Sequence, residues 1–91
     1  MAEPTSHSFT VHAPIGLHAR PVAQIVSLVR ESGVDVTLRD STGKEASAAS
    51  ALRMLAMKVR SGDLLEIIVD SDDQASALGL AKDIEALVNE G

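Results

Sequence analysis

Apolar residues alternate with polar ones along some stretches of the chain and recur at helical spacing along others. The alternation over residues 8–13 (SFTVHA), and again from Val34 to Arg39, predicts two half-buried strands. Residues 64–69 (LLEIIV) are apolar enough to form a central strand. The turn residues 40–43 (DSTG) would let residues 44–49 return as a short antiparallel strand.

Helical spacing predicts three helices between and after these strands. The first runs from about Ala19 to Ser32, with Gly33 as its stop signal. A short helix covers residues 51–57, with Ser50 as its N-cap. The last follows the acidic run 70–73 and carries one apolar stripe: Ala77, Leu80, Ala81, Ile84, Leu87 and Val88. The order β-α-β-β-α-β-α predicts a two-layer α/β domain whose sheet is covered on one face by helices.

Ninety-one residues suffice for one hydrophobic core, so residues 1–91 are expected to form a single domain. A domain of this size buries too little surface to enclose a deep active site, so chemistry is expected at the surface or in a site shared with a larger partner. The net charge of −5 and a single aromatic residue, Phe9, argue against nucleic acid as a partner. The first sixty residues nevertheless hold seven bases and five acids, so a basic face can coexist with an acidic whole.

The sequence lacks the residues or segments that several other functional classes require. The absence of cysteine excludes disulfides and thiolate metal sites. No apolar run reaches the length of a membrane span, and the start MAEPTSHS does not resemble a signal peptide. We therefore expect a cytoplasmic, monomeric protein without membrane insertion. His7 and His12 are expected to be surface residues that do not face one way, and no metal or cofactor is predicted.

The segment Gly16-Leu17-His18-Ala19-Arg20-Pro21 carries the candidate chemistry, because it joins the first strand to the first helix. Pro21 is tolerated in a first helical turn, and Gly16 permits a sharp bend. Free N–H groups at the helix start, together with the guanidinium of Arg20, would form an anion cradle beside His18. A neutral imidazole there can accept a phosphoryl group and release it again.

The stretch VHAPIGLHARPVAQIV resembles the active-site segment of HPr, the histidine-containing phosphocarrier family of the bacterial phosphoenolpyruvate-dependent phosphotransferase system. The resemblance covers about residues 9–88. It implies an open-faced sandwich with a four-stranded antiparallel sheet and three helices on one face. It also implies that His18 receives a phosphoryl group on Nδ1 from enzyme I and donates it to IIA components of sugar permeases. Arg20 would stabilise the phosphoryl group, and Pro21 would begin the helix. Such a carrier is not an enzyme in the strict sense.

The same resemblance assigns residues outside this segment. Ser50 matches the serine that a dedicated kinase phosphorylates in many relatives, although it is also a sensible N-cap and Ala49 stands where a lysine is frequent. The positions expected to meet partner proteins are Ala19, Ala23, Arg30, Ala51, Leu52, Arg53 and Leu55. Met54 and Met57 are expected in the core. Lys58 stands where relatives often have glycine, so either it bears a strained positive φ or the loop 58–62 has another shape.

Three alternatives remain beside a sugar-transport carrier. A nitrogen-related branch of the same system would use the same chemistry for regulation. A ferredoxin-like module that binds a small ligand would have the same order of elements, but it would leave the His-Ala-Arg-Pro motif unexplained. A regulatory relative that acts through a serine and lacks the histidine is disfavoured, because His18 is present.

Overall fold

The computed structural model describes residues 4–90, and its elements follow in the predicted order. Residues 1–3 and 91 of the expected domain lie outside this range. The strands are β1 (Thr5–Thr10), β2 (Asp35–Asp40), β3 (Glu45–Ser47) and β4 (Leu64–Asp70). The helices are α1 (Ala19–Ser32), α2 (Ala51–Ala56) and α3 (Gln74–Glu90).

The four strands form one antiparallel sheet in the order β1-β4-β2-β3. β4 lies between β1 and β2, which confirms the central strand expected from its apolar run. Thr10 at the end of β1 pairs with Leu64 at the start of β4, and Asp40 pairs with Leu65. The loop that follows β1 and the loop that precedes β4 therefore lie at the same end of the sheet.

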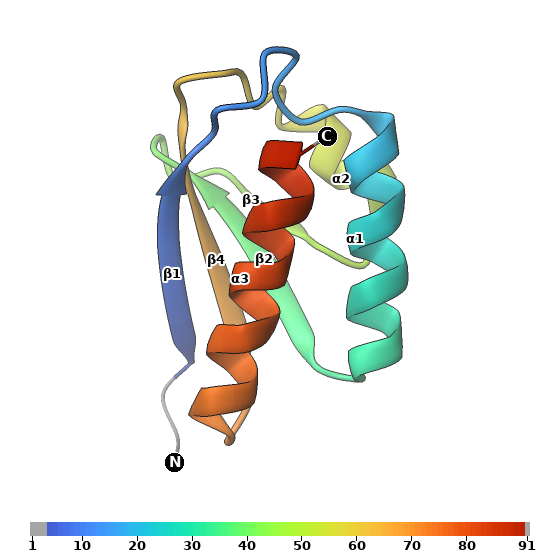
Figure 1. Ribbon diagram of the computed structural model, residues 1–91, viewed down its shortest axis with the longest axis vertical. Coiled ribbons are helices and arrows are strands. Elements are labelled where there is room, and N and C mark those ends of the chain that lie inside the picture. Colours follow the sequence, from blue (N-terminus) through green and yellow to red (C-terminus); the bar gives the residue numbers. More distant parts are fainter. Residues whose placement is uncertain (1–3, 91) are drawn as a thin grey trace.

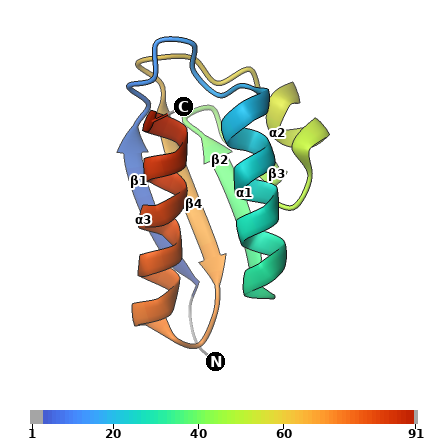
Figure 2. The ribbon, with the colours of Figure 1, turned by 45° about the vertical axis from the view of Figure 1, so that its right-hand side comes forward.

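The helices cover one face of the sheet, as expected. α1 and α3 run alongside each other over it, and α2 lies next to α1 (Figures 1 and 2). Between the two layers lies a core of aliphatic side chains in which Leu38, Leu65 and Ile67 from the sheet are fully buried. Met54 and Met57 belong to this core, as predicted. Leu80 and Leu87 on the apolar stripe of α3 are partly buried against it, and the other four residues of that stripe are fully buried.

Two predicted strand ranges need correction. β1 covers residues 5–10 rather than 8–13, because β4 offers ladder partners only up to Leu64. Buried and exposed side chains still alternate through Val11 and Ala13. The sequence pattern therefore predicted correctly which of these side chains are buried, but not where the pairing of the strand ends. β3 covers only residues 45–47, and the chain bends at residues 48–49 before α2 begins.

The start and stop of α1 agree with the sequence signals. Gly33 has φ 71° and ends the helix in the left-handed conformation that favours glycine. At the other end, the loop over residues 11–18 leads from β1 into α1, beside the loop over residues 57–63 that follows α2 (Figure 1). This pair of loops positions the candidate site.

Candidate functional site

The loop before His18 is held by backbone hydrogen bonds at both of its sides. The N–H of Gly16 donates to the carbonyl of Ala13 at 2.9 Å, which closes a tight turn. The N–H of Leu17 donates to the carbonyl of Val59 at 3.0 Å, and the Leu17 side chain is buried in the core. The position of His18 is therefore fixed before α1 begins.

Gly16 is required at its position for two reasons. Its φ of 77° lies in the left-handed region, which a side chain disfavours. A Cβ atom there would also lie 2.4 Å from the carbonyl oxygen of Val59. Only glycine lets the two loops approach this closely, so the sharp bend expected from the sequence is confirmed, and its cause is the contact with Val59.

His18 is the N-cap residue of α1 and has an extended backbone, with φ −136° and ψ −178°. Its ring is half-buried, and Nδ1 lies 3.2 Å from the carbonyl oxygen of Gly16. A carbonyl oxygen only accepts hydrogen bonds, so this contact requires the tautomer that carries the proton on Nδ1. In this tautomer Nε2 holds the free lone pair of the ring.

The first turn of α1 leaves donors available beside His18. The N–H of Val22 donates to the carbonyl of His18 at 3.1 Å and is the first bond of the helix. Pro21, the third residue of the helix, has no N–H that would need a partner in this turn, and its buried side chain packs against the core. The N–H groups of Ala19 and Arg20 precede that first bond, and the structure records no partner for them within residues 4–90. The first turn of α1 thus presents N–H groups next to His18, the feature on which the expected anion cradle depends.

Arg20 is exposed and lines a hollow of about 210 Å³ together with Gln24, Leu87 and Glu90. The hollow lies between the first turns of α1 and the last turns of α3. Sequence reasoning assigned no role to Gln24, although it lies one helical turn after Arg20. Glu90 could not be placed, because only the packing of α1 against α3 brings it near Arg20. The guanidinium therefore has both an amide and a carboxylate in its surroundings.

α2 begins at Ser50 as predicted. The Ser50 hydroxyl accepts a hydrogen bond from the N–H of Arg53 at 3.3 Å, which is the capping contact. Arg30 on α1 donates to the carbonyl of Ala49 at 3.4 Å. Because Arg30 is twelve residues beyond His18, it lies about 18 Å away along the helix and closer to the start of α2.

The predicted partner-facing positions are exposed, and they lie on α1 and α2. Leu52 is 80% exposed and Leu55 is 38% exposed, unusual values for leucine on a packed helix. The remaining exposed positions of this set are Ala19, Ala23, Arg30, Ala51 and Arg53. α1 and α2 contact each other, so these residues belong to adjoining surfaces.

Lys58 takes the strained form of the two that the sequence left open. Its φ is 56°, the sole positive value at a residue other than glycine within residues 4–90. Lys58 directly follows the end of α2, and the carbonyl of the next residue, Val59, supports the His18 loop. The left-handed conformation that glycine favours is kept here despite the lysine side chain.

The two other histidines differ from each other. His12 is exposed, as predicted. The prediction of a surface position for His7 is wrong, because its ring is half-buried against α3. His7 Nε2 lies 2.5 Å from Glu85 Oε1, and the ring stacks on Phe9 with centroids 6.3 Å apart. His7 is remote in sequence from Glu85, so no local pattern indicated this contact.

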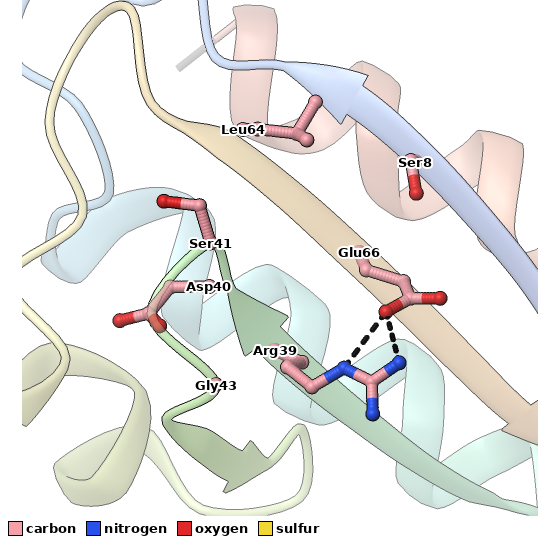
Figure 3. A pocket seen from close by; sticks show the side chains of 7 residues that line it. All are labelled: Ser8, Arg39, Asp40, Ser41, Gly43, Leu64 and Glu66. Carbon is pink, nitrogen blue, oxygen red and sulfur yellow. Dashed lines mark hydrogen bonds and ion pairs between the residues drawn. The ribbon is translucent and has the colours of Figure 1, made fainter.

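A second hollow lies on the sheet face opposite the helices (Figure 3). Its volume is about 350 Å³, and its lining residues are Ser8, Arg39, Asp40, Ser41, Gly43, Leu64 and Glu66. Arg39 is the one cation of this lining, and its Nε–H donates to Glu66 Oε1 at 2.8 Å. This hydrogen bond raises the pKa of Arg39 above its usual value. Because that charge is already paired with Glu66, the lining of this hollow offers no free cation to a ligand.

Sequence reasoning missed one feature of the His18 loop, the side chain of Ile15. It is 71% exposed at the tip of the turn between Pro14 and Gly16. A large apolar residue between proline and glycine in a turn is a visible signal. It stayed unused because the alternation of the preceding strand ends at Pro14.

Comparison with known proteins agrees with this geometry. The family model PTS-HPr, described as the phosphorylation site of the HPr component, matches residues 5–90. The multiphosphoryl transfer protein of Salmonella typhimurium is 35% identical over 89 residues, which cover 94% of this chain. This chain spans 24% of that protein's length. The phosphocarrier protein HPr of Haemophilus influenzae is 33% identical over 73 residues, covering 80% of this chain and 85% of that protein.

Solved structures share the fold. A histidine-containing phosphocarrier protein, solved in work on the divergence of Mycoplasma, superposes with a TM-score of 0.82 at 21% identity. The match covers 96% of this chain and 100% of that one. The phosphocarrier protein HPr of Bacillus anthracis superposes with a TM-score of 0.77 at 24% identity, covering 93% and 96% of the two chains. At these identities the likeness establishes the open-faced sandwich.

Proposed function

The chain belongs to the HPr family of phosphotransferase-system phosphocarriers, and from that premise we propose that His18 carries the phosphoryl group between two partner proteins. The donor we propose is phospho-enzyme I, and the acceptors are IIA components of sugar permeases. Residues 1–91 would act as one domain in this relay. The multiphosphoryl transfer relatives are longer proteins, which is consistent with such a domain working beside others.

The observation that carries the proposal is the position of His18 at the N-cap of α1. The unpaired N–H groups of Ala19 and Arg20 and the positive end of the helix dipole lie at the same helix start. Arg20 adds a guanidinium, whose planar fork of donors suits phosphate oxygens. A phosphoryl group on the imidazole would thus find compensation for its negative charge from groups already in place.

Transfer to Nδ1 needs one rearrangement of the resting site. Nδ1–H now donates to the Gly16 carbonyl, so the proton must move to Nε2 and the ring must turn Nδ1 away from that oxygen. The Nδ1 lone pair then attacks phosphorus, the bond between phosphorus and the donor breaks, and the donor group keeps its electron pair. Transfer to the acceptor reverses these steps, and His18 returns to its bond with Gly16.

The surface around His18 is suited to brief encounters with proteins. Exposed apolar side chains at Leu52 and Leu55 adjoin basic residues on α1 and α2. Residues 11–30 and 49–62, which build this surface, contain five bases and no acid. We propose that partners present apolar patches ringed by carboxylates to it.

For Ser50 we propose capping as the primary role. Its hydroxyl already satisfies the Arg53 N–H, and the side chain is half-buried. Phosphorylation by a serine kinase would place a dianion at the start of α2, next to Arg53 and near Arg30. That charge would oppose the acidic surface proposed for enzyme I.

The proposal is tested by intact mass after incubation with phosphoenolpyruvate, magnesium and enzyme I. The unaltered chain should gain one phosphoryl group that mild acid removes, and His18→Ala should gain none while keeping its fold by circular dichroism. His12→Ala is the matched control, because His12 is exposed six residues earlier and should leave the gain intact. An acid-labile phosphoryl group on His18→Ala would disprove the assignment. Transfer onward to sugar-type or nitrogen-type IIA proteins then distinguishes the two branches.

A further inference from the structure

We propose that Ile15 is an apolar docking anchor that helps to select the proteins exchanging phosphoryl groups with His18. The inference rests on the proposed function and adds a specificity residue to it. Ile15 has no polar atom in its side chain, so it has no part in the chemistry of transfer. Its role follows from its exposure, its rigidity and its distance from His18.

Exposure sets Ile15 apart from most apolar residues of this chain. At 71% it is exceeded by Leu52, at 80%, among the five exposed large hydrophobic side chains of residues 4–90. The other three are Leu55, Leu64 and Leu78. An exposed isoleucine contributes nothing to the core, and burying it against a partner stabilises a complex in proportion to the apolar area removed from water.

The backbone holds Ile15 in a fixed position. Pro14 restricts the residue before it, and the Gly16 N–H closes the turn onto Ala13 at 2.9 Å. Gly16 itself lies against the Val59 carbonyl, so the turn cannot slide along the neighbouring loop. A side chain on so rigid a turn loses little backbone entropy on binding, which is the property of an effective anchor.

The distance to His18 places Ile15 inside any transfer complex. The two residues are three apart in sequence, so their Cα atoms are separated by about 11 Å at most. A partner must bring its reacting atom within about 3.5 Å of the phosphoryl group. A standard interface covers about 800 Å² on each protein, equivalent to a disc of about 16 Å radius. Ile15 therefore becomes covered whenever His18 reacts with a protein.

The occupant that fits is a phosphoryl-transfer protein with apolar surface facing the turn at residues 14–16. The same protein would meet Leu52, because α2, which carries it, lies at the same end of the molecule as the turn (Figure 1). Basic residues rather than acids flank both positions in sequence, so the rim of the partner's apolar surface should be acidic. A partner with a polar surface opposite Ile15 would bind less tightly, because its polar groups would lose water without gaining a hydrogen bond from the isoleucine side chain.

The test compares Ile15→Ala, Ile15→Leu and Leu78→Ala in steady-state phosphoryl transfer from enzyme I and to a IIA protein. Alanine removes the apolar side chain without adding a hydrogen-bonding group, and leucine conserves its area. Leu78, an exposed residue on the early part of α3, serves as the matched control. α3 begins at the end of the molecule opposite the loop that leads into α1 (Figure 1). We expect Ile15→Ala to raise KM about tenfold with kcat unchanged, as loss of uniform binding predicts. Ile15→Leu and Leu78→Ala should stay within about twofold of the unaltered chain.

Other outcomes contradict the inference in distinguishable ways. An unchanged KM in Ile15→Ala, with normal phosphorylation of His18, would overturn the anchor while leaving the proposed function intact. A fall in kcat, or faster hydrolysis of the phosphohistidine, would show that Ile15 acts on the chemistry instead. A dimer of the unaltered chain that Ile15→Ala dissociates would identify a second copy as the occupant and overturn the proposal. If the unaltered chain accepts no acid-labile phosphoryl group, the proposed function fails first, and the inference fails with it.

Discussion

Gly16 supports the His18 loop through the absence of a side chain. It combines a φ of 77° with a backbone approach that would bring a Cβ atom within 2.4 Å of the Val59 carbonyl oxygen. A carbonyl in a hydrogen-bonded loop cannot move aside as a flexible side chain can, because it also accepts the N–H of Leu17. The loop must therefore shift as a whole if Gly16 is replaced.

We expect Gly16→Ala to lower the free energy of unfolding by about 3 kcal/mol. This is the sum of the cost of a left-handed backbone at alanine and the cost of the overpacked contact with Val59. Gly43→Ala is the matched control, since Gly43 has φ 94° and a Cβ atom added there would meet no other atom within 4 Å. It should cost about 1 kcal/mol from conformation alone. Urea unfolding measures both, and equal losses in the two variants would contradict the contact with Val59.

Single residues were predictable from the sequence where their role is local. His18, Pro21 and Ser50 occupy helix starts, and a helix start is fixed by neighbours in the chain. At Lys58 the family resemblance left two forms open, and the φ of 56° shows that the strained one is adopted. His7 could not be placed, because its burial against α3 depends on Glu85, which is far away in sequence. Ile15 had a local signal in the turn between Pro14 and Gly16, but that signal was not used.

The turn between β2 and β3 is organised by one carboxylate. Asp40 Oδ1 accepts from the N–H and the hydroxyl of Thr42, at 2.9 and 2.7 Å, and from the N–H of Lys44 at 2.9 Å. The hydroxyl bond from Thr42 is the main cause that lowers the pKa of Asp40 below its usual value. A carboxyl group with a lowered pKa stabilises the folded state at pH values above its unfolded pKa, and this contribution is lost as the pH falls through the folded value.

We therefore expect Asp40→Asn to lower the melting temperature at pH 7 and to have a progressively smaller effect below about pH 4. Asparagine keeps a weaker acceptor but cannot lose a proton, so its own stability should depend less on pH in the acid range. Thermal unfolding from pH 2 to pH 7 measures the difference. Asp83→Asn, at an exposed position on α3, is the control and should follow the unaltered chain. A constant gap between Asp40→Asn and the unaltered chain across the range would contradict the role given to the charge.

Whole elements followed from the sequence more faithfully than their pairing. The bounds of α1 agree with the pattern because Gly33 ends the helix in the left-handed conformation and Pro21 is tolerated only in its first turn. β1 was misplaced by three residues because alternation reports which side chains are buried. Hydrogen bonding in a ladder depends instead on the extent of the partner strand, and β4 begins only at Leu64. The strand order β1-β4-β2-β3 joins segments distant in sequence, and no local signal contains it.

The molecule as a whole separates its charges by function. The segments that build the surface around His18, residues 11–30 and 49–62, contain Arg20, Arg30, Arg53, Lys58 and Arg60 and no acid. All thirteen acids and three bases occur in the rest of the chain, so these segments are basic within a chain of net charge −5, and Glu90 of α3 is an acid that lies near Arg20. Such an asymmetric field orients the protein as it approaches an acidic partner, and the orientation precedes contact.

This separation predicts that the rate of association between this chain and enzyme I falls as salt is added. Raising the ionic strength from about 50 to about 500 mM shortens the Debye length below the reach of these charges, so kcat/KM for transfer from enzyme I should fall about tenfold. Arg53→Gln should lower the rate at low salt and flatten its salt dependence, because one steering charge is lost from the surface around His18. Lys82→Gln on α3 removes the same charge from the acidic part of the chain and should leave the salt dependence unchanged. If both variants had the same slope, net charge rather than its placement would control the encounter, and the separation of charges along this chain would have no part in directing partners to His18.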